Sequence, residues 1–289
     1  MRNSSVEPVA SPHLIIGIGT NKSATTWIHT CVSEHPEICG SEPKETHYFS
    51  SNYSNGENWY KSCFKDCASS QKRFEYSPDY INDHQALQRI KNYAPDAKLL
   101  VCMRNPIDRI HSAYEFNKER AAHNFKTFDA YLEYHKKHGE VPLKKALYGS
   151  LLEKVFRIFE KERVHVTFFD DIKRDPENYI RNIYTFLEID PTFTPPSLHT
   201  KVNKTSRGVV RFRTLNYALH SVRFFVAKRP LLQAPRTIFK KLGLNNFVQF
   251  ILKNNSRTST TLPKKEKEML TEEARGVLQE YYREDIEKL

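Results

Sequence analysis

Short apolar runs alternate, over the first two thirds of the chain, with segments in which apolar residues recur at helical spacing. The runs predict strands over Leu14–Ile18, Leu99–Met103 and Val164–Phe169, and the spacing predicts helices over Trp27–His35, Ile107–Glu119 and Lys144–Lys161. This alternation is typical of an α/β fold with a central parallel sheet and helices on both faces. Ligands of such folds bind at the carboxyl ends of the strands, so the residues after each apolar run are the first candidates for chemistry.

The segment after the first apolar run has the composition of an anion-binding loop. The run is broken at Gly17 and Gly19, and residues Lys22–Trp27 (KSATTW) then lead into the first predicted helix. A strand, a tight turn and a helix start leave free N–H groups and the positive end of the helix dipole pointing at the turn. One lysine and three hydroxyl groups at that place suit a phosphate or a sulfate.

The spacing of this loop excludes the phosphate-binding loop of nucleoside triphosphatases. With Lys22 as the motif lysine, the two required glycines fall on Ile16 and Asn21. The strand over Leu99–Met103 is followed by Arg104, whereas a Walker B strand ends in an aspartate that holds Mg²⁺. The two segments therefore disfavour a nucleoside triphosphate held through Mg²⁺ and favour an anion that is bound without a metal ion.

The segment after the second apolar run carries a second set of phosphate ligands. Residues Arg104–Pro106 mark a strand end and a helix start, and Ser112 follows about two helical turns after Arg104. The guanidinium of Arg104 can bind a phosphate through two parallel hydrogen bonds, and Ser112 can add a hydroxyl donor.

Both segments resemble motifs of the sulfotransferases that use 3′-phosphoadenosine 5′-phosphosulfate (PAPS). Residues Lys22–Trp27 resemble the 5′-phosphosulfate loop, whose common form is KSGTTW, with Ala24 in place of the glycine. Residues Arg104–Tyr114 resemble the 3′-phosphate motif RNPxxRxxSxY. The motifs are most similar to those of heparan-sulfate-type and bacterial members. The resemblance implies a P-loop-like sulfotransferase fold that binds PAPS and releases PAP.

Further segments follow the family order. Pro43–Phe49 resembles an E-x-H-F-F segment, and Phe74–Tyr80 resembles EKTPxY, with Tyr76 where a lysine often contributes. Leu147–Leu187 resembles the block that opens with a Y-x-x-x-L helix, and Val202–Gly208 resembles the loop that closes over the nucleotide. The cofactor-binding residues implied by the resemblance are Lys22, Ser23, Ala24, Thr25, Thr26, Trp27, Arg104, Ser112, Tyr148, Lys204, Arg207 and Gly208.

The resemblance also implies a reaction, the transfer of the sulfuryl group from PAPS to a hydroxyl or amine. Lys22 would stabilise the leaving phosphate, Glu45 would be the general base, and His47 would orient Glu45 or act as an alternative base. The expected acceptor is a small-molecule metabolite or a saccharide. Two other classes stay open, a nucleotide kinase of related fold and a non-catalytic binder of PAP or sulfated glycans.

Length and hydropathy predict one domain without a membrane span. A chain of 289 residues can form one sulfotransferase domain over 13–289 after a flexible arm over 1–12. No window approaches 18 uninterrupted apolar residues, and the amino terminus lacks the apolar centre of a signal peptide. These features favour a cytoplasmic location. The family commonly continues past the position of Leu289 with a segment that ends near a tryptophan.

The five cysteines favour a reducing compartment. Their odd number leaves one unpaired in any complete disulfide scheme, and Cys31 and Cys102 lie in predicted core elements. Cys63 and Cys67 could alternatively form a disulfide, or bind zinc together with histidines, but the chain has no second cysteine pair of that spacing. No metal site is expected.

The chain carries 45 basic and 34 acidic residues, a net charge of +11. Much of the excess lies in the basic, aromatic-rich subregion over 207–261. Three interpretations of this subregion stay open: a cap over the acceptor cleft, a surface for an acidic glycan or a membrane, and a solvated basic face. No nucleic-acid partner is expected. The polar residues over Asn254–Thr261 predict a linker, and a last helix is predicted over Lys264–Leu289.

Overall fold

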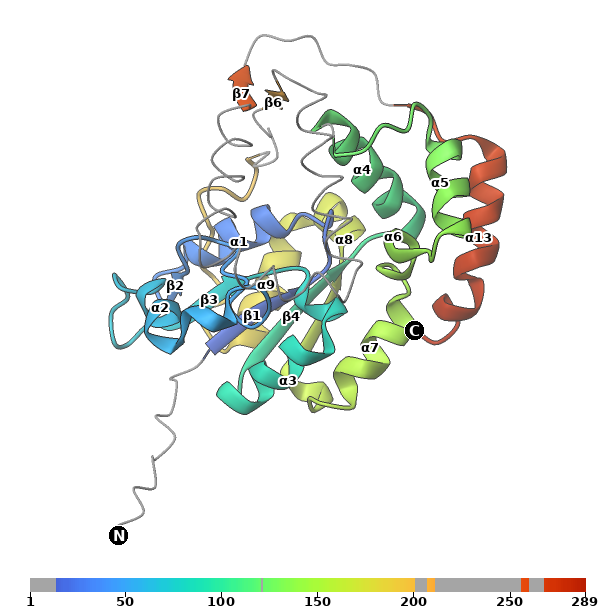
Figure 1. Cartoon of the computed structure of the whole chain (residues 1–289). Helices are drawn as coiled ribbons and strands as arrows, with labels where there is room; N and C mark the ends of the chain where they lie inside the picture. The colour runs from blue at the N-terminus through green and yellow to red at the C-terminus, as the bar shows by residue number, and fades with distance from the viewer. Residues whose placement is uncertain (1–13, 121, 201–206, 211–255, 260–267) are drawn as a thin grey trace. The chain divides into compact units, whose positions relative to one another are not determined.

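A five-stranded parallel sheet is the centre of the first of two structural units (Figure 1). The structure is a computed structural model that describes residues 14–120, 122–200, 207–210, 256–259 and 268–289. The first unit contains the residues up to 109, 145–203 and 282–289, and the second contains 110–144 and 204–281. The predicted arm over 1–12 lies outside the described residues.

The strands of the sheet are β1 (Leu14–Gly19), β2 (Ile38–Gly40), β3 (Lys72–Tyr76), β4 (Lys98–Met103) and β5 (Val164–Phe168). Their order is β2-β3-β1-β4-β5, and all four pairings are parallel. Every residue of β1 is buried, because this strand is paired on both edges and covered on both faces. The predicted α/β class and the three predicted strands are confirmed.

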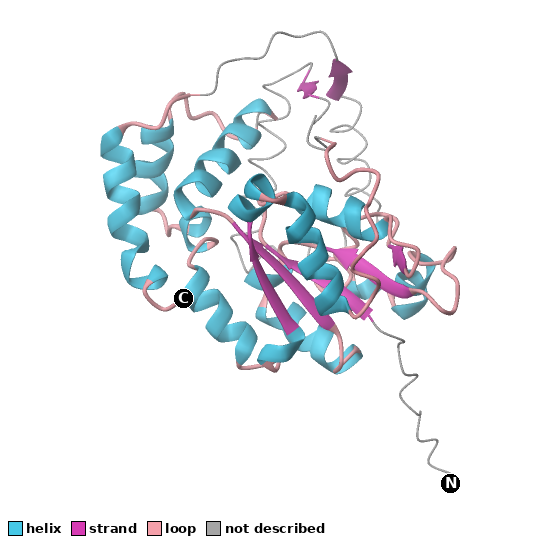
Figure 2. Cartoon of the chain, turned by 180° about the vertical axis from the view of Figure 1, so that it is seen from behind, coloured by secondary structure: helices cyan, strands magenta, loops and turns pink. Residues whose placement is uncertain are grey.

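Helices cover both faces of this sheet. The helices of the first unit are α1 (Thr25–Ser33), α2 (Glu57–Ser62), α3 (His84–Tyr93), α7 (Tyr148–Phe156), α8 (Phe169–Arg174) and α9 (Pro176–Leu187), with short 3₁₀ turns η1 (Tyr53–Asn55), η2 (Tyr80–Asn82) and η3 (Lys161–Arg163). Helices α1 and α9 share one apolar cluster with Ile15 of β1. Helices α3 and α7 lie on the opposite face, as the two opposed views show (Figure 1; Figure 2).

The second unit begins inside a helix. Its elements are α4 (Pro106–Glu119, entering from the first unit), α5 (Phe128–Lys137), α6 (Val141–Lys144), the antiparallel strands β6 (Arg207–Val210) and β7 (Ser256–Ser259), and most of α13 (Glu272–Ile286). The carboxylate of Glu268 accepts hydrogen bonds from Phe128 N (2.6 Å), Tyr114 OH (2.9 Å) and Lys118 Nζ (2.7 Å). None of the described helices is long and apolar enough to cross a membrane.

Two predicted helices begin later than expected because of capping groups. The helix predicted over Lys144–Lys161 is broken before α7, where the Asp285 carboxylate accepts hydrogen bonds from Gly149 N (2.8 Å) and Ser150 N (2.9 Å). The helix predicted from Lys264 begins at Glu272, because the Thr271 hydroxyl caps it by accepting from Ala274 N (3.1 Å). The linker prediction is wrong over Ser256–Ser259, which forms β7, and the rest of that linker lies outside the described residues.

The structure corrects the interpretation of the cysteines. Cys39, the middle residue of β2, forms a disulfide with Cys67, and the two Cα atoms are 5.5 Å apart, within the usual range for a bridge. Cys31, Cys63 and Cys102 are free and buried, so the alternative in which Cys63 pairs with Cys67 is wrong. Burial raises the pKa of Cys102 to about 12, which keeps this thiol protonated and unreactive at neutral pH.

Breaking the disulfide is expected to destabilise the protein. The bridge joins residues 28 positions apart, and a loop of that size is worth about 2–4 kcal/mol of unfolding free energy. Urea unfolding with and without dithiothreitol measures the difference. In a variant that combines Cys39→Ser with Cys67→Ser, the reductant should have no effect. Coincident curves for the unaltered protein would contradict the bridge.

Candidate functional site

Polar segments follow four neighbouring strands of the sheet and meet at one edge. The Lys22 loop follows β1, Arg104 follows β4, the segment Ser41–His47 follows β2, and Ser77 follows β3. Because β2, β3, β1 and β4 are adjacent and parallel, their carboxyl ends lie side by side. This edge is where ligands bind in open parallel sheets.

The Lys22 loop is anchored to β4. The backbone N–H and the hydroxyl of Thr20 both donate to the Cys102 carbonyl oxygen at 2.9 Å. The Thr20 hydroxyl also lies 2.9 Å from the hydroxyl of Ser23, which is fully buried. These contacts fix the turn that carries Lys22 into α1.

The turn leaves the start of α1 without a side-chain cap among the described residues, as a predicted anion site requires. Ala24 is the N-cap residue of α1, and no side chain caps this helix among the described residues, so its first N–H groups remain available. Lys22 (φ 71°) and Ala24 (φ 55°) both adopt the left-handed backbone region. This region costs an alanine about 1–2 kcal/mol, a cost that the glycine of the common motif avoids. Trp27 lies in the core, and its indole N–H donates to the Leu198 carbonyl at 3.1 Å.

Arg104 lies beside this loop and keeps donors available. Its Nη1 donates to the Lys22 carbonyl at 3.2 Å, and its guanidinium lies 4.7 Å from the centre of the Phe169 ring. The Nε atom is buried and has no hydrogen-bond partner among the described residues. A guanidinium has five N–H donors, so Arg104 can bind an anion while it holds the loop. The buried Tyr148 hydroxyl lies near the Thr20 side chain and the Arg104 backbone.

Four other predicted cofactor ligands do not belong to the part of the first unit described above. Ser112 is half-buried on α4, within the second unit, and Lys204 lies outside the described residues. Arg207 and Gly208 belong to β6, and Gly208 pairs with Thr258 of β7. The roles of these four residues stay predictions.

A compact group of charges forms the second half of the site. The Lys44 ammonium lies 2.7 Å from Glu45 Oε1, and His47 Nε2 lies 3.4 Å from Glu45 Oε2. The same ammonium lies 3.5 Å from the Thr25 hydroxyl, at the first residue of α1. This contact connects the predicted base to the anion-binding loop.

The two cations change the acidity of this carboxyl group. Burial raises the pKa of Glu45, but the hydrogen bond from His47 and the charge and hydrogen bond of Lys44 outweigh it and lower the pKa to about 2. The hydrogen bond to Glu45 raises the pKa of His47 above its ordinary value of 6.5, against the effect of burial. The Glu45–His47 pair is therefore ionised from below pH 4.5 to above pH 6.5.

Glu75, on β3, is a buried residue of this site to which no sequence motif assigned a role. It is fully buried, and it accepts hydrogen bonds from Thr46 Oγ1 (2.5 Å), Ser77 Oγ (2.9 Å) and Tyr60 OH (3.0 Å). The Ser77 hydroxyl accepts in turn from His47 N (3.0 Å). Glu75 thus fixes the backbone on which Glu45 and His47 stand. The available signal was an acidic residue between two aromatic residues, Phe74 and Tyr76, at the end of a strand.

Tyr76 does not add a charge where the family motif often has a lysine. Its hydroxyl donates to the Gly19 carbonyl at 2.6 Å, and its ring is buried against β1. A Cβ atom at Gly17 would lie 2.2 Å from this ring, so the position next to the ring requires glycine. The Lys44 ammonium lies 5.8 Å from the centre of the same ring.

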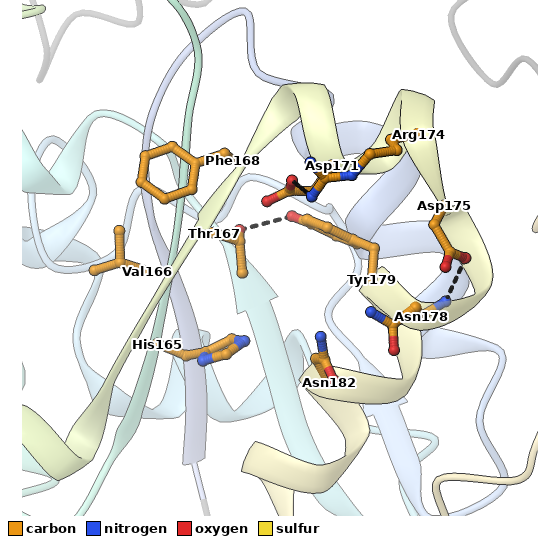
Figure 3. Close-up of a pocket in the computed structure, with 10 residues that line it drawn as sticks. All are labelled: His165, Val166, Thr167, Phe168, Asp171, Arg174, Asp175, Asn178, Tyr179 and Asn182. Carbon is orange, nitrogen blue, oxygen red and sulfur yellow. Dashed lines mark hydrogen bonds and ion pairs between the residues drawn. The ribbon is translucent and has the colours of Figure 1, made fainter.

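A cavity of about 320 Å³ lies elsewhere in the first unit, between β5 and the helices α8 and α9 (Figure 3). Thr167 and Tyr179 bond to each other across it at 2.7 Å, and Arg174 pairs with Asp171. Burial lowers the pKa of His165, so this lining residue is neutral at pH 7. The cavity contains none of the predicted site residues and no cation that is not already paired, so it does not suit a multiply charged anion.

Comparisons with known proteins agree with this architecture. The profile of the family described as "Sulfotransferase domain" matches residues 11–222, well over half of the chain. A solved structure, "Crystal Structure of Sulfotransferase from Alicyclobacillus acidocaldarius", aligns with a TM-score of 0.58 and 26% identity over 74% of this chain and 94% of that one.

Curated relatives match over shorter segments. The "Membrane-associated sulfotransferase kil1" of Dictyostelium discoideum is 38% identical over 109 residues, which is 37% of this chain and 23% of that protein. "Heparan sulfate glucosamine 3-O-sulfotransferase 6" of Homo sapiens is 34% identical over 99 residues, 34% of this chain and 28% of that protein. The chain thus matches about a quarter of the length of these two relatives. Because the family profile spans most of the chain, which forms the parallel sheet described above, the chain belongs to the sulfotransferase domain family.

Proposed function

We propose that this protein is an enzyme that transfers the sulfuryl group from PAPS to a hydroxyl or amine of a small molecule or saccharide. The observation that carries the proposal is the 3.5 Å contact between Lys44 and Thr25. This contact joins an anion-binding helix start to a carboxylate that can serve as a base. Both belong to the first unit, and the family profile covers both.

The residues at the strand ends fit a nucleotide with phosphates at both ends. The Lys22 loop and the first N–H groups of α1 would bind the 5′-phosphosulfate. Arg104, with its buried and unpaired Nε, would bind the 3′-phosphate, as the predicted motif implies. We include Ser112, Lys204, Arg207 and Gly208 in this assignment on the resemblance alone.

Bound PAPS would supply a sulfuryl group on a good leaving group, and the chain would supply charge stabilisation and a base. Lys22 and the N–H groups of the loop stabilise the negative charge that grows on the bridging oxygen as its bond to sulfur breaks. Glu45 takes the proton of the acceptor, and His47 orients Glu45 through its hydrogen bond. Glu75 holds both residues in place through Thr46 and Ser77.

The proposal also concerns the class of acceptor and the cellular compartment. The name of the human relative refers to glucosamine in heparan sulfate, which supports a saccharide as one acceptor class. The cytoplasmic location stays a prediction. The Cys39–Cys67 disulfide weighs against it, since disulfides persist mainly in oxidising compartments. The name of the Dictyostelium relative likewise refers to a membrane.

One experiment separates this function from the kinase and from the non-catalytic binder. PAP should raise the melting temperature without Mg²⁺, and transfer of ³⁵S-labelled sulfate from PAPS should continue in EDTA, because Arg104 stands where a kinase places its metal-binding aspartate. A kinase would instead be stabilised by ATP with Mg²⁺. A non-catalytic binder would be stabilised by PAP and would transfer no label to any hydroxyl or amine compound tested as an acceptor. Loss of turnover in EDTA with recovery in Mg²⁺ would contradict the proposal.

A further inference from the structure

The Lys44 ammonium occupies a position between two groups that need positive charge at different times. One is the Glu45 carboxylate, 2.7 Å away, and the other is the start of α1, marked by the Thr25 hydroxyl 3.5 Å away. The Lys44 side chain is 19% exposed, whereas that of Glu45 is 42% exposed. The lysine is thus the more enclosed partner of the pair.

The backbone of Lys44 is held in place. Its carbonyl oxygen accepts a hydrogen bond from Ser41 Oγ (3.2 Å) and one from Tyr76 N (3.4 Å), at the end of β3. A lysine carries its ammonium on four rotatable methylene groups, so a fixed backbone still lets the charge move by a few ångströms. The ammonium can therefore exchange partners without any movement of the sheet.

Lys44 contacts both groups, the Glu45 carboxylate and the Thr25 hydroxyl. His29, on α1, has its pKa lowered to about 4 by burial and by the charge of Lys44, so it is neutral at pH 7. His47 contacts the other oxygen of Glu45, and its further acidic neighbours are Asp79 and Glu75. Of the two Glu45 oxygens, Oε1 is the one that Lys44 occupies.

We propose that Lys44 is a second catalytic cation. When the sulfuryl donor binds, the Lys44 ammonium moves from Glu45 Oε1 to the phosphosulfate of the donor. Glu45 Oε1 is then free to accept the proton of the acceptor. This inference rests on the proposed function. In the step, the acceptor oxygen or nitrogen forms a bond to sulfur, and the bond from sulfur to the bridging oxygen breaks. The electron pair of the broken bond stays on the departing phosphate, beside Lys22 and Lys44. The acceptor proton moves to Glu45 Oε1.

The exchange resolves a conflict in the charge pattern. A carboxylate held by two cations is a weak base, because both cations favour its ionised form. A bound phosphosulfate competes with Glu45 for the Lys44 ammonium. Glu45 therefore becomes a stronger base only when the donor is bound. Donor binding and base activation are coupled through one side chain.

The test combines kinetics with a binding cycle that does not depend on turnover. Lys44→Met should lower kcat by about 100-fold, the size of effect seen when one charge-stabilising donor is lost. It should also weaken PAP binding by about tenfold, because one charge-assisted contact is lost. Lys44→Arg, which keeps the charge, should recover most of both quantities. Lys61→Met is the matched control, since Lys61 forms a surface ion pair with Glu57 and should change neither.

The binding cycle measures the exchange itself. Glu45→Gln releases Lys44 and should tighten PAP binding by about two- to fivefold, the range expected for an exposed ion pair. In a Lys44→Met background the same change should have no effect on PAP affinity. A Lys44→Met enzyme with unaltered kcat and PAP affinity would overturn the inference while leaving the proposed function intact. Absence of PAP binding and of sulfate transfer in the unaltered protein would instead overturn the proposed function.

Discussion

Glu45→Gln is expected to lower kcat by about 10²–10⁴-fold, the usual contribution of a general base. The substitution keeps the shape of the side chain and its place beside His47 and Lys44 but removes the group that accepts a proton. PAP affinity should be retained, with at most the small gain predicted for the release of Lys44. Steady-state kinetics with labelled PAPS and calorimetry with PAP give the two quantities.

Two controls sharpen this expectation. Lys22→Ala should reduce both PAP affinity and kcat, because Lys22 meets the phosphosulfate in the ground state and more strongly in the transition state. His47→Gln should be milder than Glu45→Gln if His47 only orients the base. Retention of most turnover by Glu45→Gln on the true acceptor would show that another residue is the base, and His47 would then be tested first.

Arg104→Ala is expected to weaken PAP binding by about 1.5–3 kcal/mol, the loss that follows removal of charge-assisted hydrogen bonds to a phosphate. The affinity for adenosine 5′-phosphosulfate, which lacks the 3′-phosphate, should fall much less. Arg104 also donates to the Lys22 carbonyl at 3.2 Å, so its removal should disturb the Lys22 loop and weaken the binding of both ligands. Calorimetry with both ligands separates the two contributions.

Arg163→Ala is the matched control for Arg104→Ala. Arg163, the last residue of η3, donates hydrogen bonds to Asp96, and its loss should leave both affinities unchanged. Equal losses for the two ligands in Arg104→Ala would remove Arg104 from the 3′-phosphate site and limit it to holding the loop.

The parts of the fold that were predicted are those in which local sequence determines the outcome. The apolar run Leu14–Ile18 has the length and composition of a buried strand, and the two positions at which a triphosphate loop requires glycine hold Ile16 and Asn21. Arg104 follows β4 directly, so its place at the carboxyl edge follows from the strand itself. The boundaries of α1 differ from prediction by two residues at each end, and those of α4 by one residue at its start, which is the ordinary uncertainty of helix ends.

The parts that were not predicted depend on contacts between distant residues. The cap of α7 comes from Asp285, 136 residues away from Gly149, and the partner of Cys67 is Cys39, 28 residues before it. The approach of Lys44 to Thr25 brings together the ends of β2 and β1, two strands that are not neighbours in the sheet. These contacts depend on strand order and on the packing of helices and loops, and the local sequence pattern contains no information on either.

The buried ring of Tyr76 has a consequence for the order in which substitutions can be accepted. It lies so close to Gly17 that no side chain fits there, and its hydroxyl holds the carbonyl of Gly19. A change of Tyr76 to lysine would remove the ring and the obstacle to a Cβ atom, but it would also leave a cavity beside β1. Positions 17 and 76 are therefore epistatic. A lineage that replaces Tyr76 with lysine therefore meets less resistance if Gly17 changes afterwards, because any side chain at position 17 would clash with the tyrosine ring.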